Sequence, residues 1–334
     1  MVPFLPKFVT DLFQGTVRDP VITLSGRLDL ERDPQSLFRL LGQLYKQLSL
    51  SPSDQAIIDL KDCEFIYPAV VLLLLGFRES LGGNPPALAL KLGQGTSIHE
   101  FLESIHIGEY FDFPELPVGH VKQFTDSTLV SPLQEVREIG DTERLATKLF
   151  DLFRGWQAMT PAVAGRTVDS FAEILRNVKQ HSGSNCLRVL GQAYPESKNL
   201  RFCFYDNGIG IKSHLTRRPY AQTHGVFQSE VAEVRFQEIE RLPANAAIEE
   251  AARYMVSSTD YEDNSGAGLE FLIRDLSLPM EGKITIVSQD GYVRWEKGEK
   301  VDSFALPFEF RGTLVSVTVH AEPGTKLAFQ SETR

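Results

Sequence analysis

The stretch LRFCFYDNGIGI, residues 200–211, decides how the second half of this chain folds. It opens with a run rich in aromatic and aliphatic residues, which is typical of a buried β-strand. Asp206, Asn207 and Gly208 are common turn formers and end that strand. With Gly210 on the next alternate position, the pattern indicates either an ordinary turn or a close approach of backbone to a flat ligand. In the second case the Asp206 carboxylate would accept a hydrogen bond from an amino group.

The segment EILRNVKQH, residues 173–181, lies upstream and predicts a helix. It places Glu173, Asn177 and His181 at i, i+4 and i+8, so that they share one face of the helix. On a helix that faces a nucleotide, Asn177 would offer its side-chain oxygen to Mg²⁺, and Glu173 would accept a proton from a water or hydroxyl. The same spacing occurs on many solvated helices, so this motif alone leaves both interpretations open.

A second glycine motif follows a long spacer and precedes the apolar-periodic stretch GLEFLIRDLSL. Its residues are Gly266, Ala267, Gly268 and Leu269. Glycines just before a helix expose unpaired N–H groups at the positive end of the helix dipole, and such an arrangement suits a phosphate. A tight turn is the alternative interpretation of an isolated G-x-G.

Together and in this order, the three motifs resemble the GHKL ATPase/kinase superfamily. Its members, among them histidine kinases and anti-sigma-factor kinases, share the Bergerat nucleotide-binding fold. The resemblance covers roughly residues 130–322, and FRGTLVSVTV near its end is similar to the family's last strand, with its terminal G-T at Gly312-Thr313. The resemblance implies that the cofactors are ATP and Mg²⁺.

The same resemblance implies a role for each motif residue. Glu173 would be the general base and Asn177 the Mg²⁺ ligand. Asp206 would contact adenine with help from Thr313. The floor beneath the adenine would be shaped by Gly208 and Gly210, and the phosphates would be wrapped by Gly266, Ala267, Gly268 and Leu269.

The first part of the chain alternates strand-like and helix-like patterns. Strands are predicted at residues 20–30, 55–66 and 87–93, and helices at 34–48, 69–77 and 97–111. This order predicts an α/β sheet with helices packed on it. The GRLDL opening, and the strand IIDLKDCEFI followed by an apolar helix, resemble the STAS domain of anti-sigma-factor antagonists over about residues 18–113.

One departure from the STAS pattern bears on function. Where that family has Asp-Ser-x-Gly, this chain has Tyr67-Pro68-Ala69-Val70. The phosphoacceptor serine would fall on Pro68, which has no hydroxyl. The resemblance therefore implies a docking or scaffolding role for this domain rather than a switch by phosphorylation at that position.

The fold class predicted for the chain is α/β, with an N-terminal STAS-like α/β domain followed by a Bergerat-fold α/β sandwich with a long helical lid. Two domains are the natural expectation for 334 residues. The predicted boundaries are 1–113 for the STAS-like domain, 114–132 for a linker, 133–322 for the ATP-binding domain, about 212–264 for its lid, and 323–334 for a tail.

Composition and charge narrow the function further. The net charge of −10, with no basic stripe in the sequence, argues against a nucleic-acid surface. Cys63, Cys186 and Cys203 are widely spaced in apolar contexts and are expected to be buried free thiols. The most membrane-like run, residues 69–77, is too short to cross a bilayer, and MVPFLPKFVTDLF lacks an extended apolar region. No membrane association and a cytoplasmic location are therefore expected.

Three classes of function stay open. The first is a nucleotide-gated signalling regulator or anti-sigma-like serine/threonine protein kinase, in which Glu173 activates a hydroxyl of a separate protein partner. The second is an ATPase whose lid and oligomeric state respond to hydrolysis. The third is a non-catalytic, ATP-dependent protein-binding module. A homodimer is compatible with each of them.

Overall fold

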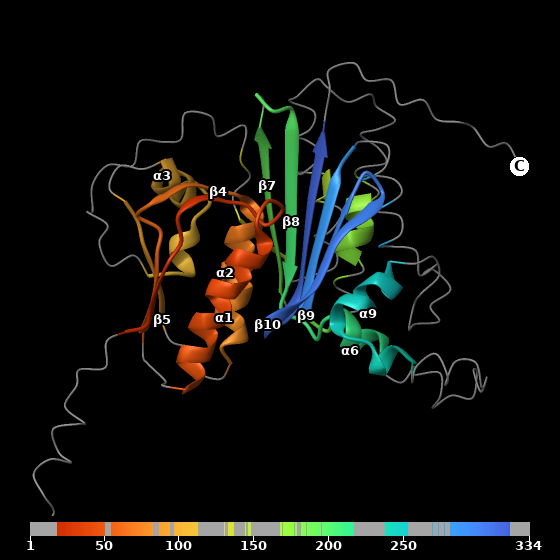
Figure 1. The fold of residues 1–334 in the computed structure, drawn as a ribbon. Helices are drawn as coiled ribbons and strands as arrows, with labels where there is room; N and C mark the ends of the chain where they lie inside the picture. Colours follow the sequence, from red (N-terminus) through yellow and green to blue (C-terminus); the bar gives the residue numbers. More distant parts are fainter. Residues whose placement is uncertain are drawn as a thin grey trace, which may run out of the picture.

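The computed structural model of the chain describes both halves and shows a mixed α/β protein, as predicted (Figure 1). The described residues are 19–50, 55–82, 87–93, 97–112, 130, 133–136, 144, 146–147, 168, 170–176, 178, 182–184, 186–194, 196–216, 238–252, 269, 273, 277 and 281–320. We refer to residues 19–112 as the N-terminal unit.

The elements of the N-terminal unit confirm the predicted alternation of strands and helices. They are β1 Val21–Thr23, β2 Gly26–Leu28, α1 Pro34–Leu50, β3 Gln55–Asp59, β4 Cys63–Ile66, α2 Pro68–Ser80, β5 Ala87–Lys91, α3 Ser97–Ser104 and the 3-10 helix η2 Ile107–Glu109. Strands β1, β3 and β5 form a parallel sheet in the order β1-β3-β5, and β2 pairs with β4 in parallel.

The two longest predicted strands of this unit are each divided in two. In the first, Gly26 has a φ of 70°, a left-handed conformation that interrupts a strand. In the second, Asp59 accepts a hydrogen bond from the Lys61 N–H at 3.0 Å, and the Cys63 N–H donates to the Leu60 carbonyl at 3.0 Å. These local bonds form a turn between β3 and β4.

Residues 68–77 of α2 are apolar on all sides, which suits a helix that lies between two sheets. Every residue from 68 to 77 is buried, and Pro68 stands at the start of the helix, where its missing N–H leaves no intrahelical bond unmade. The position implied for a phosphoacceptor is therefore a buried helix start.

The second half contains a five-stranded antiparallel sheet. Its strands are β6 Gln134–Val136, β7 Leu187–Tyr194, β8 Asn199–Asp206, β9 Lys283–Glu296 and β10 Glu299–His320, in the order β6-β7-β8-β10-β9. β8 and β10 contain the strands predicted above, whereas β7 and β9 have no counterpart among the predictions. Helices α6 Ile211–Leu215 and α9 Ala244–Ala251 lie in the region predicted as a helical lid.

Alternate side chains of β8 enter two different cores. Phe202 and Phe204 pack on Phe171 of the helical residues 170–176, with ring centroids 4.7 and 5.4 Å apart. Cys203 and Tyr205 point the other way, into a cluster formed with α1 and α2. The N-terminal unit thus covers one face of the five-stranded sheet, and helical residues cover the other (Figure 1).

Buried charges also join the N-terminal unit to the sheet. Arg201 of β8 donates two hydrogen bonds to the Asp29 carboxylate, each 3.1 Å, and lies 3.6 Å from Glu31. Arg188 of β7 donates to Glu79 of α2 at 2.6 Å. One apolar cluster and these ion pairs therefore connect the two halves, whose predicted domain boundaries stay predictions.

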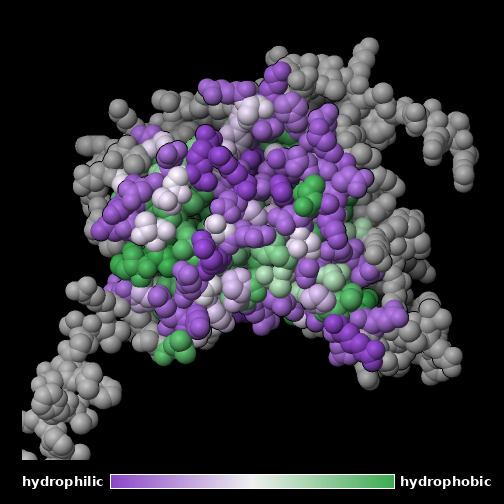
Figure 2. All heavy atoms as spheres, in the orientation of Figure 1, coloured by the Kyte–Doolittle hydropathy of each residue, from purple (hydrophilic) through white to green (hydrophobic). Residues whose placement is uncertain are grey.

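The cysteines agree with the prediction. Cys63, Cys186 and Cys203 are free and buried, and burial raises the pKa of the Cys63 thiol to about 11. Within the described segments, no helix is both long and apolar enough to cross a bilayer. Hydrophilic side chains predominate on the face drawn in Figure 2, where the apolar patches are small and separate.

Candidate functional site

Asp206 is the last residue of β8 and is almost completely buried, with 1% of its surface exposed. Its Oδ1 accepts a hydrogen bond from the Gly208 N–H at 2.8 Å, and the Ser182 hydroxyl also donates to the carboxylate. Burial raises the pKa of this carboxyl to about 7, the two donors oppose the rise, and the nearby charge of Glu79 adds to it. Asp206 therefore changes charge near neutral pH, a property common at functional sites.

The two glycines after Asp206 fill positions that a side chain could not. A Cβ on Gly208 would lie 2.2 Å from the Ser182 carbonyl oxygen. Gly210 has a φ of 81°, and a Cβ there would lie 2.6 Å from Gln289 Cγ. The missing side chains therefore let the loop pack closely on Ser182 and Gln289.

Gly312 and Thr313 of β10 lie directly beside Asp206. The register of the antiparallel pair sets Thr313 opposite Asp206. Gly312 has a φ of 84°, and a Cβ there would lie 1.8 Å from the Asp206 carbonyl oxygen. Thr313 shares a face of the sheet with Val315 and Phe204, the face covered by the helical residues 170–176.

The structure thus brings together Asp206, Gly208, Gly210 and Thr313. Residues 206–210 and 312–313 are called the β8-end site below.

Ser288 of β9 connects the loop after β8 to β10 by hydrogen bonds. Its Oγ accepts a hydrogen bond from the Ile211 N–H at 2.9 Å, donates to the Gly312 carbonyl at 3.1 Å, and lies 3.1 Å from Thr313 Oγ1. A hydroxyl has one proton, and Ser288 donates its proton to the Gly312 carbonyl. The hydrogen bond between the two hydroxyls must therefore be donated by Thr313 and accepted by Ser288. The Thr313 oxygen then keeps its lone pairs for a donor group such as an amine.

The end of the helical layer is bonded to the same loop. The Ser182 N–H donates to the Val178 carbonyl at 2.9 Å, and the Ser182 carbonyl accepts from the Ile209 N–H at 2.9 Å. The Ser184 hydroxyl donates to Asn207 Oδ1 at 2.6 Å. Helix end and loop therefore form one hydrogen-bonded unit on the face to which Asp206 belongs.

Glu173 lies in the helical residues 170–176, on that face of the sheet. Its side chain is 31% exposed and pairs with Arg176 at 3.3 Å, one turn along. No contact between Glu173 and Asp206 occurs in the described part of the chain. The structure places the predicted base on the expected layer and does not bring it into contact with the β8-end site.

The other predicted residues divide into two groups. Asn177, Gly266, Ala267 and Gly268 lie outside the described residues. Leu269 is helical and half-buried, and with Ile211 it packs against the cluster formed by Leu215, Ile239 and Ala251. The end of the second glycine motif is therefore near α6, the helix that begins at Ile211.

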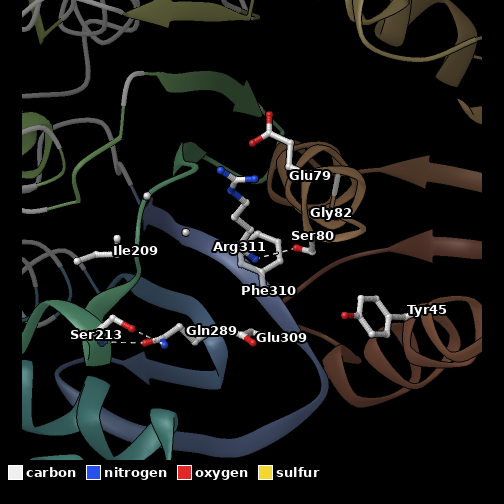
Figure 3. A pocket seen from close by; sticks show the side chains of 12 residues that line it. Tyr45, Glu79, Ser80, Gly82, Ile209, Ser213, Gln289, Glu309, Phe310 and Arg311 are labelled. Atoms are coloured by element: carbon white, nitrogen blue, oxygen red, sulfur yellow. Dashed lines mark hydrogen bonds between the residues drawn. The ribbon is translucent and has the colours of Figure 1, made fainter. Parts of the chain in front are cut away.

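A cavity of about 560 Å³ opens beside the β8-end site, between the loop and the N-terminal unit (Figure 3). Glu79 and Ser80 of α2 and Tyr45 of α1 line it on one side, and Ser213 and Gln289 on the other. Gly208, Ile209 and Gly312 also line it. Where the chain is described, no group of three or more His, Cys, Asp or Glu side chains is arranged to hold a metal ion.

Sequence reasoning missed the residues that organise this site. They are Ser182, Ser184, Asn207 and Ser288. Asn207 sits inside the recognised motif and was interpreted only as a turn former. Ser288 lies in the strand KITIVSQDGYVRWE, which also carries Thr285, Gln289 and Asp290, so its place in the sequence does not mark it.

No protein-family model matches this chain, and no curated protein matches it in sequence.

Proposed function

We propose that this chain binds Mg²⁺–ATP at the β8-end site and acts as a nucleotide-gated signalling regulator of the GHKL type on a separate protein partner. The observation that carries the proposal is the pairing of a buried Asp206 with Thr313, beside a loop that its glycines let pack closely. Both side chains offer oxygen lone pairs on one face of the sheet.

This arrangement suits the flat, amino-bearing edge of adenine. The carboxylate of Asp206 accepts from the exocyclic amino group, and Thr313 assists. Gly208 and Gly210 shape the floor beneath the ring by letting the loop pack closely on Ser182 and Gln289. Since an ionised carboxylate is the better acceptor, nucleotide affinity should rise as pH increases through about 7, the pKa of Asp206.

The remaining roles follow the family resemblance. Asn177 holds Mg²⁺, Gly266, Ala267, Gly268 and Leu269 wrap the phosphates, and Glu173 accepts the proton of the attacking group. Since Pro68 has no hydroxyl and is buried at the start of α2, phosphotransfer to that position of the same chain is excluded. A kinase activity would act on an external protein hydroxyl.

Two alternatives keep the same nucleotide site. An ATPase would use the helical region around α6 and α9 as a lid that responds to hydrolysis. A non-catalytic module would use bound ATP only to fix its binding surfaces. The pairing of Glu173 with Arg176 favours this alternative, because a carboxylate held in an ion pair is a weaker proton acceptor.

Calorimetric titration with ATP and Mg²⁺ tests the site, with Asp206→Ala as the variant expected to lose binding. Incubation with γ-labelled ATP, alone and with cell lysate, then separates the three classes, with Glu173→Ala as the control. Free phosphate supports the ATPase, label on another protein supports the kinase, and binding without either product supports the module. Absence of ATP binding by the wild type would overturn the proposal.

A further inference from the structure

We infer that Glu79 and Ser80, at the C-terminal end of α2, are positioning residues for the β8-end site, through which the N-terminal unit controls nucleotide affinity. The inference rests on the proposed function and names the regulation of that site. Neither residue contacts the face on which Asp206 and Thr313 lie, so both act through the strands that carry these residues.

Glu79 holds β8 one residue before Asp206. Its carboxylate accepts a hydrogen bond from the Tyr205 hydroxyl at 2.9 Å and another from Arg188 of β7 at 2.6 Å. The ring of Tyr205 is fully buried. Its hydroxyl also lies 3.2 Å from the Arg311 carbonyl of β10. One carboxylate at the end of α2 therefore fixes the residue of β8 that precedes Asp206.

Ser80 holds β10 one residue before Gly312. Its hydroxyl donates to the Gly76 carbonyl at 2.6 Å, so its oxygen is free to accept, and it accepts from the Arg311 N–H at 2.7 Å (Figure 3). The β9–β10 pairing shifts between Phe310 and Thr313, which leaves the Arg311 N–H to a partner outside the sheet. That partner is α2.

The same turn of α2 thus holds both arms of the β8-end site. Gly76 adds close packing, because a Cβ there would lie 2.2 Å from the Phe310 ring and 2.9 Å from the Tyr205 ring. By contrast, Gly208 and Ile209 are separated from α2 by the cavity of about 560 Å³. On this side the loop is therefore held through the strands that flank it, which bond to Glu79 and Ser80, and through Arg311, whose Nε donates to the Asn207 carbonyl at 3.4 Å.

Coupling of this kind is reciprocal. If α2 sets the geometry of the β8-end site, nucleotide binding must tighten the contact between α2 and β10 by the same free energy. A protein that docks on the N-terminal unit and shifts α2 would then change nucleotide affinity without touching the nucleotide.

Two pairs of variants test the inference in the full-length protein. Ser80→Ala removes the acceptor for the Arg311 N–H, and Ser49→Ala, which removes a similar bond from Ser49 to the Tyr45 carbonyl at the end of α1, is its matched control. We expect amide hydrogen exchange at residues 206–213 and 311–313 to accelerate in Ser80→Ala, and ATP affinity to fall roughly three- to tenfold. Ser80→Thr, which keeps the hydroxyl, should restore both, and Ser49→Ala should change neither.

The second pair of variants removes a charge, and its effect is measured as a shift in the pH dependence of ATP affinity. Glu79→Gln removes a negative charge near Asp206, so the pH at which ATP affinity rises should move below that of the wild type. Glu249→Gln is the control, because Glu249 also joins a helix to β10, through Ser303 at 2.8 Å, far from Asp206 in the sheet. A merely structural role for Glu79 would weaken binding without moving this pH midpoint.

The outcomes separate the inference from the proposed function. Normal ATP binding by the wild type, with unchanged exchange and affinity in Ser80→Ala and an unmoved midpoint in Glu79→Gln, would overturn the inference alone. Absence of ATP binding by the wild type would overturn the proposed function and, with it, the control of affinity. Faster exchange at residues 206–213 in Ser80→Ala would in that case still support the positioning of the loop by α2.

Discussion

The two faces of the five-stranded sheet bury charge in opposite ways. On the face covered by the N-terminal unit, charges are buried with opposite charges, as where Arg201 meets Asp29 and Glu31. On the face covered by residues 170–176, the carboxyl of Asp206 is buried among neutral donors. The buried ion pairs connect the N-terminal unit to the sheet, whereas the buried Asp206 has a raised pKa and can change its charge near neutral pH.

The difference indicates which face serves structure and which serves function. A buried pair whose charges compensate each other stabilises only while both partners are present. A buried acid without a cation lowers stability wherever it is ionised, and such a cost is typical of sites that bind or react.

The largest effect is expected from Arg201→Met. The change removes the cation that pairs with Asp29 and leaves the buried Glu31 with Lys283, 4.0 Å away, so it should lower the free energy of unfolding by about 3–5 kcal/mol. Urea denaturation near neutral pH measures it. Burial raises the pKa of Glu31, so the loss should shrink as acidification protonates that residue. The double variant with Glu31→Gln should recover part of the loss, and a loss that stays the same in both variants would contradict the argument.

Asp206→Asn should raise the free energy of unfolding, whereas Arg201→Met lowers it. Asp206 keeps its proton in the folded state up to about pH 7, whereas its ordinary pKa is 3.8, so its contribution to stability is lost as pH rises through about 7. The variant should therefore be more stable than the wild type at about pH 8, by on the order of 2–4 kcal/mol, and nearly equal to it at about pH 4. Thermal denaturation at the two pH values measures this, and a variant less stable at the higher pH would refute it.

The same two faces show what the sequence could reveal. The alternation of strands and helices in residues 19–112 is strong in the sequence, because each element carries its own periodicity. Asp206, Gly208, Gly210 and Thr313 could be proposed as site residues because they stand at fixed places in an ordered set of motifs. Their contact in space agrees with that set.

The cover formed by α2 could not be predicted in this way. The contacts between Glu79 and Tyr205 and between Ser80 and Arg311 join residues more than a hundred positions apart, and depend on the shape of both surfaces. An apolar helix such as α2 fits any buried position, so its sequence does not say which sheet it meets. Ser288 was missed for a related reason, since nothing in its spacing distinguishes it from the other polar residues of β9.

Gly76→Ala tests how closely α2 and the sheet are packed. The new methyl group would overlap the Phe310 ring and should lower the free energy of unfolding by about 1–3 kcal/mol, less the roughly 1 kcal/mol that alanine adds to a helix. Chemical denaturation measures the net change. A net gain in stability would mean that Phe310 yields freely, and that α2 does not hold this part of β10.

The smallest effect is expected from Lys300→Met, which removes an ion pair on the surface. Lys300 of β10 pairs with Glu249 of α9 at 2.5 Å, and its side chain is 47% exposed. Like the Arg201 pair, this one joins a strand to another layer, but water screens it, so the free energy of unfolding should change by no more than about 0.5 kcal/mol. Denaturation at low and high salt measures both the size and the screening. A loss as large as that in Arg201→Met would show that the number of ion pairs, rather than their burial, fastens the layers of this protein.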